Sequence, residues 1–150
     1  MSGPSFRFSL ERVRALRERA EDAAREALAG AIQDHHRTQV ATDQAAEAVL
    51  RARDSQLEAT ASPVGSEELL ARQTYLEHSE RKHRASLDAL DHSDAHVAQH
   101  RHKLTEAARN RQALERLKDH RRADHEREQA RLETIALDEI AINNFRRRAA

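Results

Sequence analysis

The six residues Ala61-Ser62-Pro63-Val64-Gly65-Ser66 are the one place between Ser5 and the C-terminus where this chain is predicted to turn. They hold the only proline and one of the two glycines in that stretch. Proline breaks a helix because it lacks an N–H donor and its ring clashes with the preceding turn, while glycine permits turn conformations. The residues on either side are mostly of types that favour helices. The sequence therefore predicts an all-α fold, an antiparallel two-helix coiled-coil hairpin with a longer second helix.

The composition excludes a compact globular core. Charged residues make up 35% of the chain and aromatic residues 3%, and much of the hydrophobic 38% is alanine. Such a composition is typical of long helices and coiled coils. There is no cysteine for a disulfide or a thiolate metal site. No apolar run approaches the roughly 18 residues that a membrane span needs. We expect a soluble, cytoplasmic protein.

The formal net charge of zero conceals an uneven distribution of charge. Residues 20–100 carry 8 Lys and Arg against 15 Asp and Glu, whereas residues 1–19 and 101–150 together carry 18 against 11. If the chain folds back at 61–66, both basic segments lie at one end and the turn end is acidic. A chance imbalance on a solvated surface is one interpretation. The other is that the two ends meet different partners.

We predict a single coiled-coil domain over residues 1–150, with helix 1 at about 6–59, a turn at 60–66 and helix 2 at about 67–147. Spacings of three and four residues in both halves indicate a helix face that packs on a partner. In helix 1 the predicted seam is Phe6, Leu10, Val13, Leu16, Ala20, Ala24, Ala27, Ala31, Ala41, Ala45, Ala48 and Val49. In helix 2 it includes two polar residues and runs through His83, Leu87, Leu90, Asp94, Val97, Arg101 and Leu104.

The second helix is predicted to be longer than the first and to project beyond it. At 1.5 Å per residue the helices are about 80 Å and 120 Å long. With the turn near residue 63, Phe6 lies opposite about His120, and residues from about 121 to 147 project beyond their partner. Large apolar residues on an unpaired helix predict a docking surface. The projecting segment carries Leu132, Ile135, Leu137, Ile140, Ile142 and Phe145.

Three histidines four residues apart, His92, His96 and His100, raise the question of a metal site. Two histidines at this spacing can share a metal. No acidic or cysteine ligand completes a closed site, and the heptad pattern turns these residues to solvent. We therefore expect no physiological metal site and no cofactor, although incidental affinity for nickel or zinc fits the spacing.

Enzymatic and nucleic-acid-binding functions have little support in the sequence. The carboxylates are expected to be water-exposed, so nothing tunes a general acid, and there is no glycine-rich phosphate loop. The arginines of residues 109–122 are interleaved with acidic residues, and few aromatic side chains are present for base stacking. We expect no enzyme and no nucleic-acid partner.

Three stretches together resemble a known family. They are residues 6–18 (FRFSLERVRALRE), 113–122 (ALERLKDHRR) and 137–141 (LDEIA). In this order and spacing the chain resembles the FliJ family, the small coiled-coil subunit of the flagellar type III export apparatus, over about residues 6–145. The resemblance implies an antiparallel two-helix coiled coil similar to the central stalk of rotary ATPases.

The resemblance also implies a non-enzymatic stalk and chaperone-escort subunit, cytoplasmic and peripherally associated with the cell membrane at the flagellar base. Its partners would be the hexameric export ATPase (FliI-like), the export gate protein (FlhA-like) and export chaperones. Tyr75 and Leu76 are the candidate contacts with the gate. The candidate contacts with the ATPase ring are Arg7, Leu10, Arg12, Leu137, Asp138, Glu139 and Phe145. For each of these residues the alternative is an ordinary seam or solvated position.

Two rival functions share the same physical features. One is the equivalent stalk of an injectisome-type secretion system. The other is a structural coiled coil that dimerises through the projecting segment and has no ATPase partner.

Overall fold

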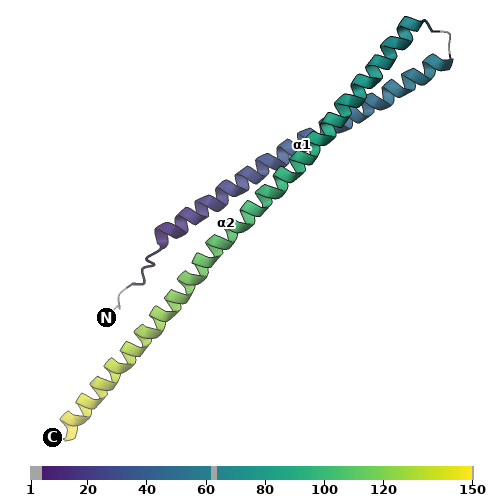
Figure 1. Cartoon of the computed structure of the whole chain (residues 1–150). Coiled ribbons are helices and arrows are strands. Elements are labelled where there is room, and N and C mark those ends of the chain that lie inside the picture. Colours follow the sequence, from purple (N-terminus) through teal and green to yellow (C-terminus); the bar gives the residue numbers. More distant parts are fainter. Residues whose placement is uncertain (1–4, 62–63, 150) are drawn as a thin grey trace. The chain divides into compact units, whose positions relative to one another are not determined.

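Two helices make up the fold, which we describe from a computed structural model of residues 5–61 and 64–149 (Figure 1). Helix α1 spans Glu11–Ala61 and helix α2 spans Ser66–Ala149, and no strand occurs in the described residues. The predicted all-α hairpin with a longer second helix is confirmed. Ser62 and Pro63, at the centre of the predicted turn, lie outside the described residues. Within the described ranges, no helical stretch is both long enough and apolar enough to cross a membrane.

The sequence around the turn explains where α2 begins. The N–H of Leu69 donates to the carbonyl oxygen of Gly65 at 3.1 Å, which is the first hydrogen bond of the new helix. Glu67 and Glu68 lie in the first turn, where their charge suits the positive end of the helix dipole.

The chain divides into two compact units, each built from a part of both helices. Unit 1 is Met1–Glu21 with Glu106–Ala150, and unit 2 is Asp22–Thr105. In each unit a segment of α1 runs antiparallel to a segment of α2. A single coiled-coil domain over residues 1–150 stays a prediction.

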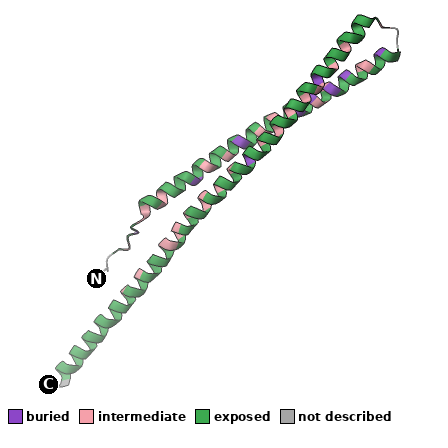
Figure 2. Ribbon diagram, viewed as in Figure 1, coloured by how far each residue is buried: buried purple, intermediate pink, exposed green. Residues whose placement is uncertain are grey.

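Unit 2 is held together by a seam of small side chains. Figure 2 shows buried positions along the sides of the helices that face each other. In α2 the small residues Ser79, Ser86 and Ser93 recur every seven residues on the packed side. In α1 one position of each heptad is a small residue, buried or half-buried: Ala24, Ala31, Thr38, Ala45, Ala52 and Ala59. Small residues on both helices let the two backbones approach closely.

A hydroxyl group demonstrates how near the backbones are. Thr42 is only 4% exposed, and its Oγ1 lies 2.9 Å from the carbonyl oxygen of Thr38 in its own helix. The same Oγ1 lies 3.1 Å from the carbonyl oxygen of Ser86 in the other helix. A threonine side chain is short, so this contact requires close approach of the two helices at this layer.

The α2 seam runs through Ser93 and His100, one residue before the predicted Asp94 and Arg101. Asp94 and Arg101 are exposed, so their assignment to the seam was wrong. Leu87, also a predicted seam residue, is 42% exposed. Leu90, Val97 and Leu104 fit either pattern, so the intervening positions decide the register. Against an alanine-lined helix a serine fits the narrow gap, whereas a leucine at every layer would push the helices apart.

The predicted seam of α1 was right at some positions and wrong at others. Ala24, Ala31, Ala45 and Val49 are buried or half-buried as expected. The side chains that the structure leaves exposed instead are Val13, Leu16, Ala20, Ala27 and Ala41. Four of the wrong positions lie one residue before a packed residue, because the prediction followed apolar residues where the structure packs Arg14, Glu21, Leu28 and Thr42.

Several ion pairs join the two helices of unit 1. Glu21 is 4% exposed and accepts a hydrogen bond from Nε of Arg111. Arg14 donates to Glu115 at 2.8 Å, and Nζ of Lys118 lies 3.0 Å from Glu11. Hydrogen bonds from Arg14 and then Lys118 lower the pKa of Glu11.

Residues 5–10, which we call the N-terminal strap, are not helical, and α1 begins at Glu11 rather than near Phe6. Extended chain advances about 3.3 Å per residue, against 1.5 Å in a helix, so the strap reaches further along α2 than a helix would. The Phe6 ring lies 5.8 Å from that of His125, and Arg121 donates to Ser9 at 3.3 Å. Phe6 was expected opposite His120.

Replacing Ala45 by Leu tests the small-residue seam. Ala45 is 4% exposed, and overpacking a tight interface typically costs about 1–3 kcal/mol. We expect Ala45→Leu to lower the stability of the hairpin by about that amount, measured by urea unfolding followed by circular dichroism. Ala41→Leu is the matched control, since Ala41 is exposed and a surface substitution changes stability by about 0.5 kcal/mol or less. A larger loss from Ala41→Leu would mean that the predicted register was correct after all.

Replacing Arg111 by Met tests the buried ion pair of unit 1. The variant leaves the Glu21 carboxylate buried without its arginine partner, which is more costly than losing both charges. We expect Arg111→Met to lower Tm, and the double variant Glu21→Met/Arg111→Met to recover most of the loss. Arg109→Met, at an exposed position nearby, should leave Tm unchanged. Equal effects of Arg109→Met and Arg111→Met would contradict this role for the pair.

Candidate interaction surfaces

The end of α2 exposes its large apolar side chains. Every residue from 131 to 148, which we call the terminal segment, is exposed. Leu137 is 66% exposed and Phe145 74%. The other exposed apolar residues of the segment are Leu132, Ile135, Ile140 and Ile142. Ordinary burial in a seam within this chain therefore does not account for these residues.

The apolar residues of the terminal segment lie on more than one side of α2. Leu132, Ile135 and Ile142 keep the heptad phase of the α2 seam. Leu137 and Ile140 lie on another side, since each residue turns the helix by about 100°. A helix that is apolar on several sides is typical of helices that are surrounded by protein.

The terminal segment begins later than the sequence predicted. The strap packs against α2 as far as His125, and an open pocket of about 620 Å³ beside it extends to Glu133. Residues 121–130 are therefore not a free extension of the helix, contrary to the prediction. The cause is the non-helical strap, which brings Phe6 beside His125 rather than His120, about one and a half turns further along α2.

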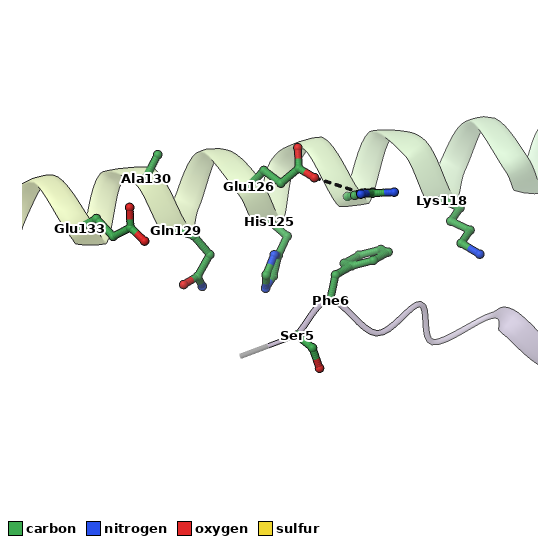
Figure 3. Close-up of a pocket in the computed structure, with 9 residues that line it drawn as sticks. Ser5, Phe6, Lys118, His125, Glu126, Gln129, Ala130 and Glu133 are labelled. Atoms are coloured by element: carbon green, nitrogen blue, oxygen red, sulfur yellow. Dashed lines mark hydrogen bonds and ion pairs between the residues drawn. The ribbon is translucent and has the colours of Figure 1, made fainter. Parts of the chain in front are cut away.

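The pocket beside the strap is nearly balanced in charge. Figure 3 shows the Phe6 ring facing His125, with Gln129 and Glu133 further along α2. Arg122 donates to Glu126 at 3.0 Å, and Lys118 bonds Glu11 outside the pocket. Because both cations already have carboxylate partners, the pocket is better suited to a mixed polar and apolar side chain than to a free anion.

All of the predicted ATPase contacts belong to unit 1. Arg7 and Arg12 are exposed, and Leu10 is half-buried where the strap joins α1. The strap pocket ends at Glu133, so the strap lies beside the start of the terminal segment. The remaining predicted contacts lie further along α2 and are all exposed: Leu137, Asp138, Glu139 and Phe145.

The two predicted gate contacts differ in their surroundings. Tyr75 is 55% exposed, whereas Leu76 is half-buried in the seam of unit 2. Tyr75 lines a shallow, mostly apolar hollow on one side of α2, together with Leu70 and His78. Leu70 is 68% exposed and was missed by the sequence analysis. Its position five residues before Tyr75, with Ala71 and Thr74 between them, could have identified it.

Catalytic or metal chemistry of a closed site has no support in the described residues. No group of three or more His, Cys, Asp or Glu side chains among them is placed to hold a metal ion. Of the histidine series, His92 and His96 are exposed as expected, but His100 is half-buried. The expectation that the whole series faces solvent was wrong for His100, because the seam runs through position 100 and not 101.

Comparison with protein families settles the relationship of this chain. The family model described as Flagellar FliJ protein matches residues 6–150, essentially the whole chain. The chain belongs to the FliJ family. No curated protein and no solved structure matches it. As a FliJ family member it is a flagellar export-related coiled-coil protein, of a family that is a non-catalytic component of export.

Proposed function

We propose that this FliJ family member is the stalk and chaperone-escort subunit of the flagellar type III export apparatus, and that it binds the hexameric export ATPase and promotes its assembly and activity. The observation that carries the proposal is the exposed apolar terminal segment of unit 1. A ring encloses whatever enters it, which matches a helix with apolar side chains on several sides. Family membership supplies the export context.

The free energies of burial and association favour a partner that covers the terminal segment on several sides. Full burial of one Leu, Ile or Phe side chain contributes about 1.5–3 kcal/mol. Association of two proteins costs an estimated 4–15 kcal/mol in lost freedom, so several such side chains must be buried together. A partner that contacts only one side of α2 reaches about half of the six large apolar side chains of the terminal segment.

The charges of the terminal segment support orientation more than affinity. Asp138 and Glu139 are exposed among the apolar residues, where they can select a complementary partner. Arg146, Arg147 and Arg148 occupy the last turn of α2, where cations also suit the helix dipole. Their presence there is explained without a partner, so the proposal does not rest on them.

For the second partner we propose the export gate, contacted by Tyr75 in unit 2. Support comes from the exposure of Tyr75 and from the apolar hollow that it forms with Leu70. Leu76, the other residue predicted to contact the gate, is half-buried in the seam. The proposed location is the cytoplasm, peripherally at the membrane of the flagellar base.

A homodimer through the terminal segment is the rival that one observation favours. Leu132, Ile135 and Ile142 continue the seam phase and could meet a second helix. A two-helix contact of that kind would leave Leu137 and Ile140 in water, which is why a surrounding partner is the better match. An injectisome stalk has the same physical features and differs in its cargo.

Replacing Leu137 by Ser tests the ATPase contact. We expect Leu137→Ser to weaken stimulation of the purified export ATPase without changing helicity, because the side chain is 66% exposed. Leu57→Ser is the matched control, since Leu57 is 67% exposed in unit 2. ATP hydrolysis and circular dichroism are the measurements.

Truncation after Glu133 is the stronger form of the same test. It retains the strap and its pocket and removes all but one of the apolar residues of the terminal segment. The truncated chain should stay helical and lose stimulation. Full stimulation by the truncated chain, or equal losses in Leu137→Ser and Leu57→Ser, would refute the assignment. A stable dimer that leaves ATP hydrolysis unaffected would favour the structural rival.

Substitutions at Tyr75 and Leu76 test the gate contact. Tyr75→Ala removes an exposed ring and should weaken co-purification with the gate protein while leaving Tm unchanged. Leu76→Ala removes a half-buried seam residue and should lower Tm instead. Undiminished capture of the gate protein by folded Tyr75→Ala would exclude this residue from the contact.

A further inference from the structure

Two histidines of α2 bring ring nitrogens together in unit 2. Nε2 of His96 and Nε2 of His100 lie 3.2 Å apart, one helical turn from each other. The ring centroids are 4.5 Å apart, and the rings meet edge to face with an interplanar angle of 85°. At this distance one ring nitrogen can donate a hydrogen bond to the other, and the tautomers of the two rings decide which one donates.

The spacing of these nitrogens matches a metal chelate. Imidazole nitrogens bind zinc at about 2.0–2.1 Å, so two nitrogens 3.2 Å apart subtend an angle of about 100° at a shared ion. That angle lies between the square-planar and tetrahedral values. Imidazole is a preferred ligand of divalent zinc, copper and nickel.

The charges around the pair are mixed. Asp88, Asp91 and Asp94 precede it on α2, and Arg101 and Lys103 follow it. Unit 2 as a whole carries 10 Lys and Arg against 14 Asp and Glu. The proposal therefore rests on the positions of the two ring nitrogens and not on local charge.

The third histidine of the series does not join the pair. His92, one turn earlier, has its Nδ1 2.7 Å from the carbonyl oxygen of Asp88, and it is not placed as a third ligand in the described part of the chain.

We propose that His96 and His100 form an open, two-ligand site for a divalent transition-metal ion of the nickel, copper and zinc group, with water completing the coordination. The ion links two consecutive turns of α2. Since His100 belongs to the seam of unit 2, binding also holds that seam residue in its packed position. The site is independent of the proposed export function.

The test uses the full-length chain without a histidine tag, titrated with NiCl₂ at neutral pH in a calorimeter. We expect one saturable equivalent. His96→Gln should weaken binding by about tenfold or more, because a lone imidazole loses a second ligand held at high effective concentration. His96 is exposed, so the variant should stay folded, which circular dichroism checks. His78→Gln is the matched control, since His78 is exposed on α2 of the same unit and has no histidine one turn away.

Copper provides a second readout that folding defects would not imitate. Electron paramagnetic resonance of the Cu²⁺-loaded chain should show two coordinated imidazole nitrogens, and one in His96→Gln. The chain has ten histidines, so the control measures the diffuse background. Equal weakening by His78→Gln and His96→Gln, unsaturable binding in the parent chain, or a one-nitrogen copper signal would each overturn the proposal.

Discussion

Close approach of two helix backbones along a seam of alanine and serine is the constraint on which unit 2 depends. Small side chains bury little area, about 25 cal/mol for each Å² removed from water, so each layer contributes modestly. The small side chains instead bring the two helix backbones close together. The Thr42 hydroxyl shows this, because it reaches the backbone of the other helix. The same proximity fixes the register, because a leucine at every serine position would not fit. Leu87 is consequently left partly exposed while Ser86 packs.

In unit 1, charged side chains fix how the two helices pair. A buried Glu21 bonded to Arg111, and the group of Glu11, Arg14 and Lys118, take the place of the small-residue layers. Charged side chains are long, so this pairing tolerates a looser approach, and it is specific because a wrong register would bury unpaired charge. The N-terminal strap is not helical and packs on α2 as far as His125. The apolar side chains beyond its reach are left for a partner.

Much of the fold could be predicted from the sequence. A helix breaker at Pro63 and helix-favouring residues elsewhere were sufficient for the hairpin and its unequal helices, whereas the family resemblance came from residues 6–18, 113–122 and 137–141. The heptad phase of the seam could not be predicted in the same way. Leu90, Val97 and Leu104 fit two patterns, and the apolar Leu87 was preferred to Ser86 as the seam residue between them. Only part of the candidate interaction surfaces could be predicted. The terminal segment follows from its apolar residues, whereas the strap, its pocket and the exposure of Leu70 do not.

The sequence by itself determined that the chain is helical, that it turns once and that its last residues hold more apolar surface than a solvated helix needs. These are local properties, set by backbone propensities and by the order of residue types. Only the tertiary structure decided which of two adjacent residues enters the seam, where the strap stops on α2, and that His96 and His100 bring their nitrogens together. These three features depend on the distance to the opposing helix or on side-chain rotamers. The spacing of residues along one helix determines neither the distance nor the rotamers.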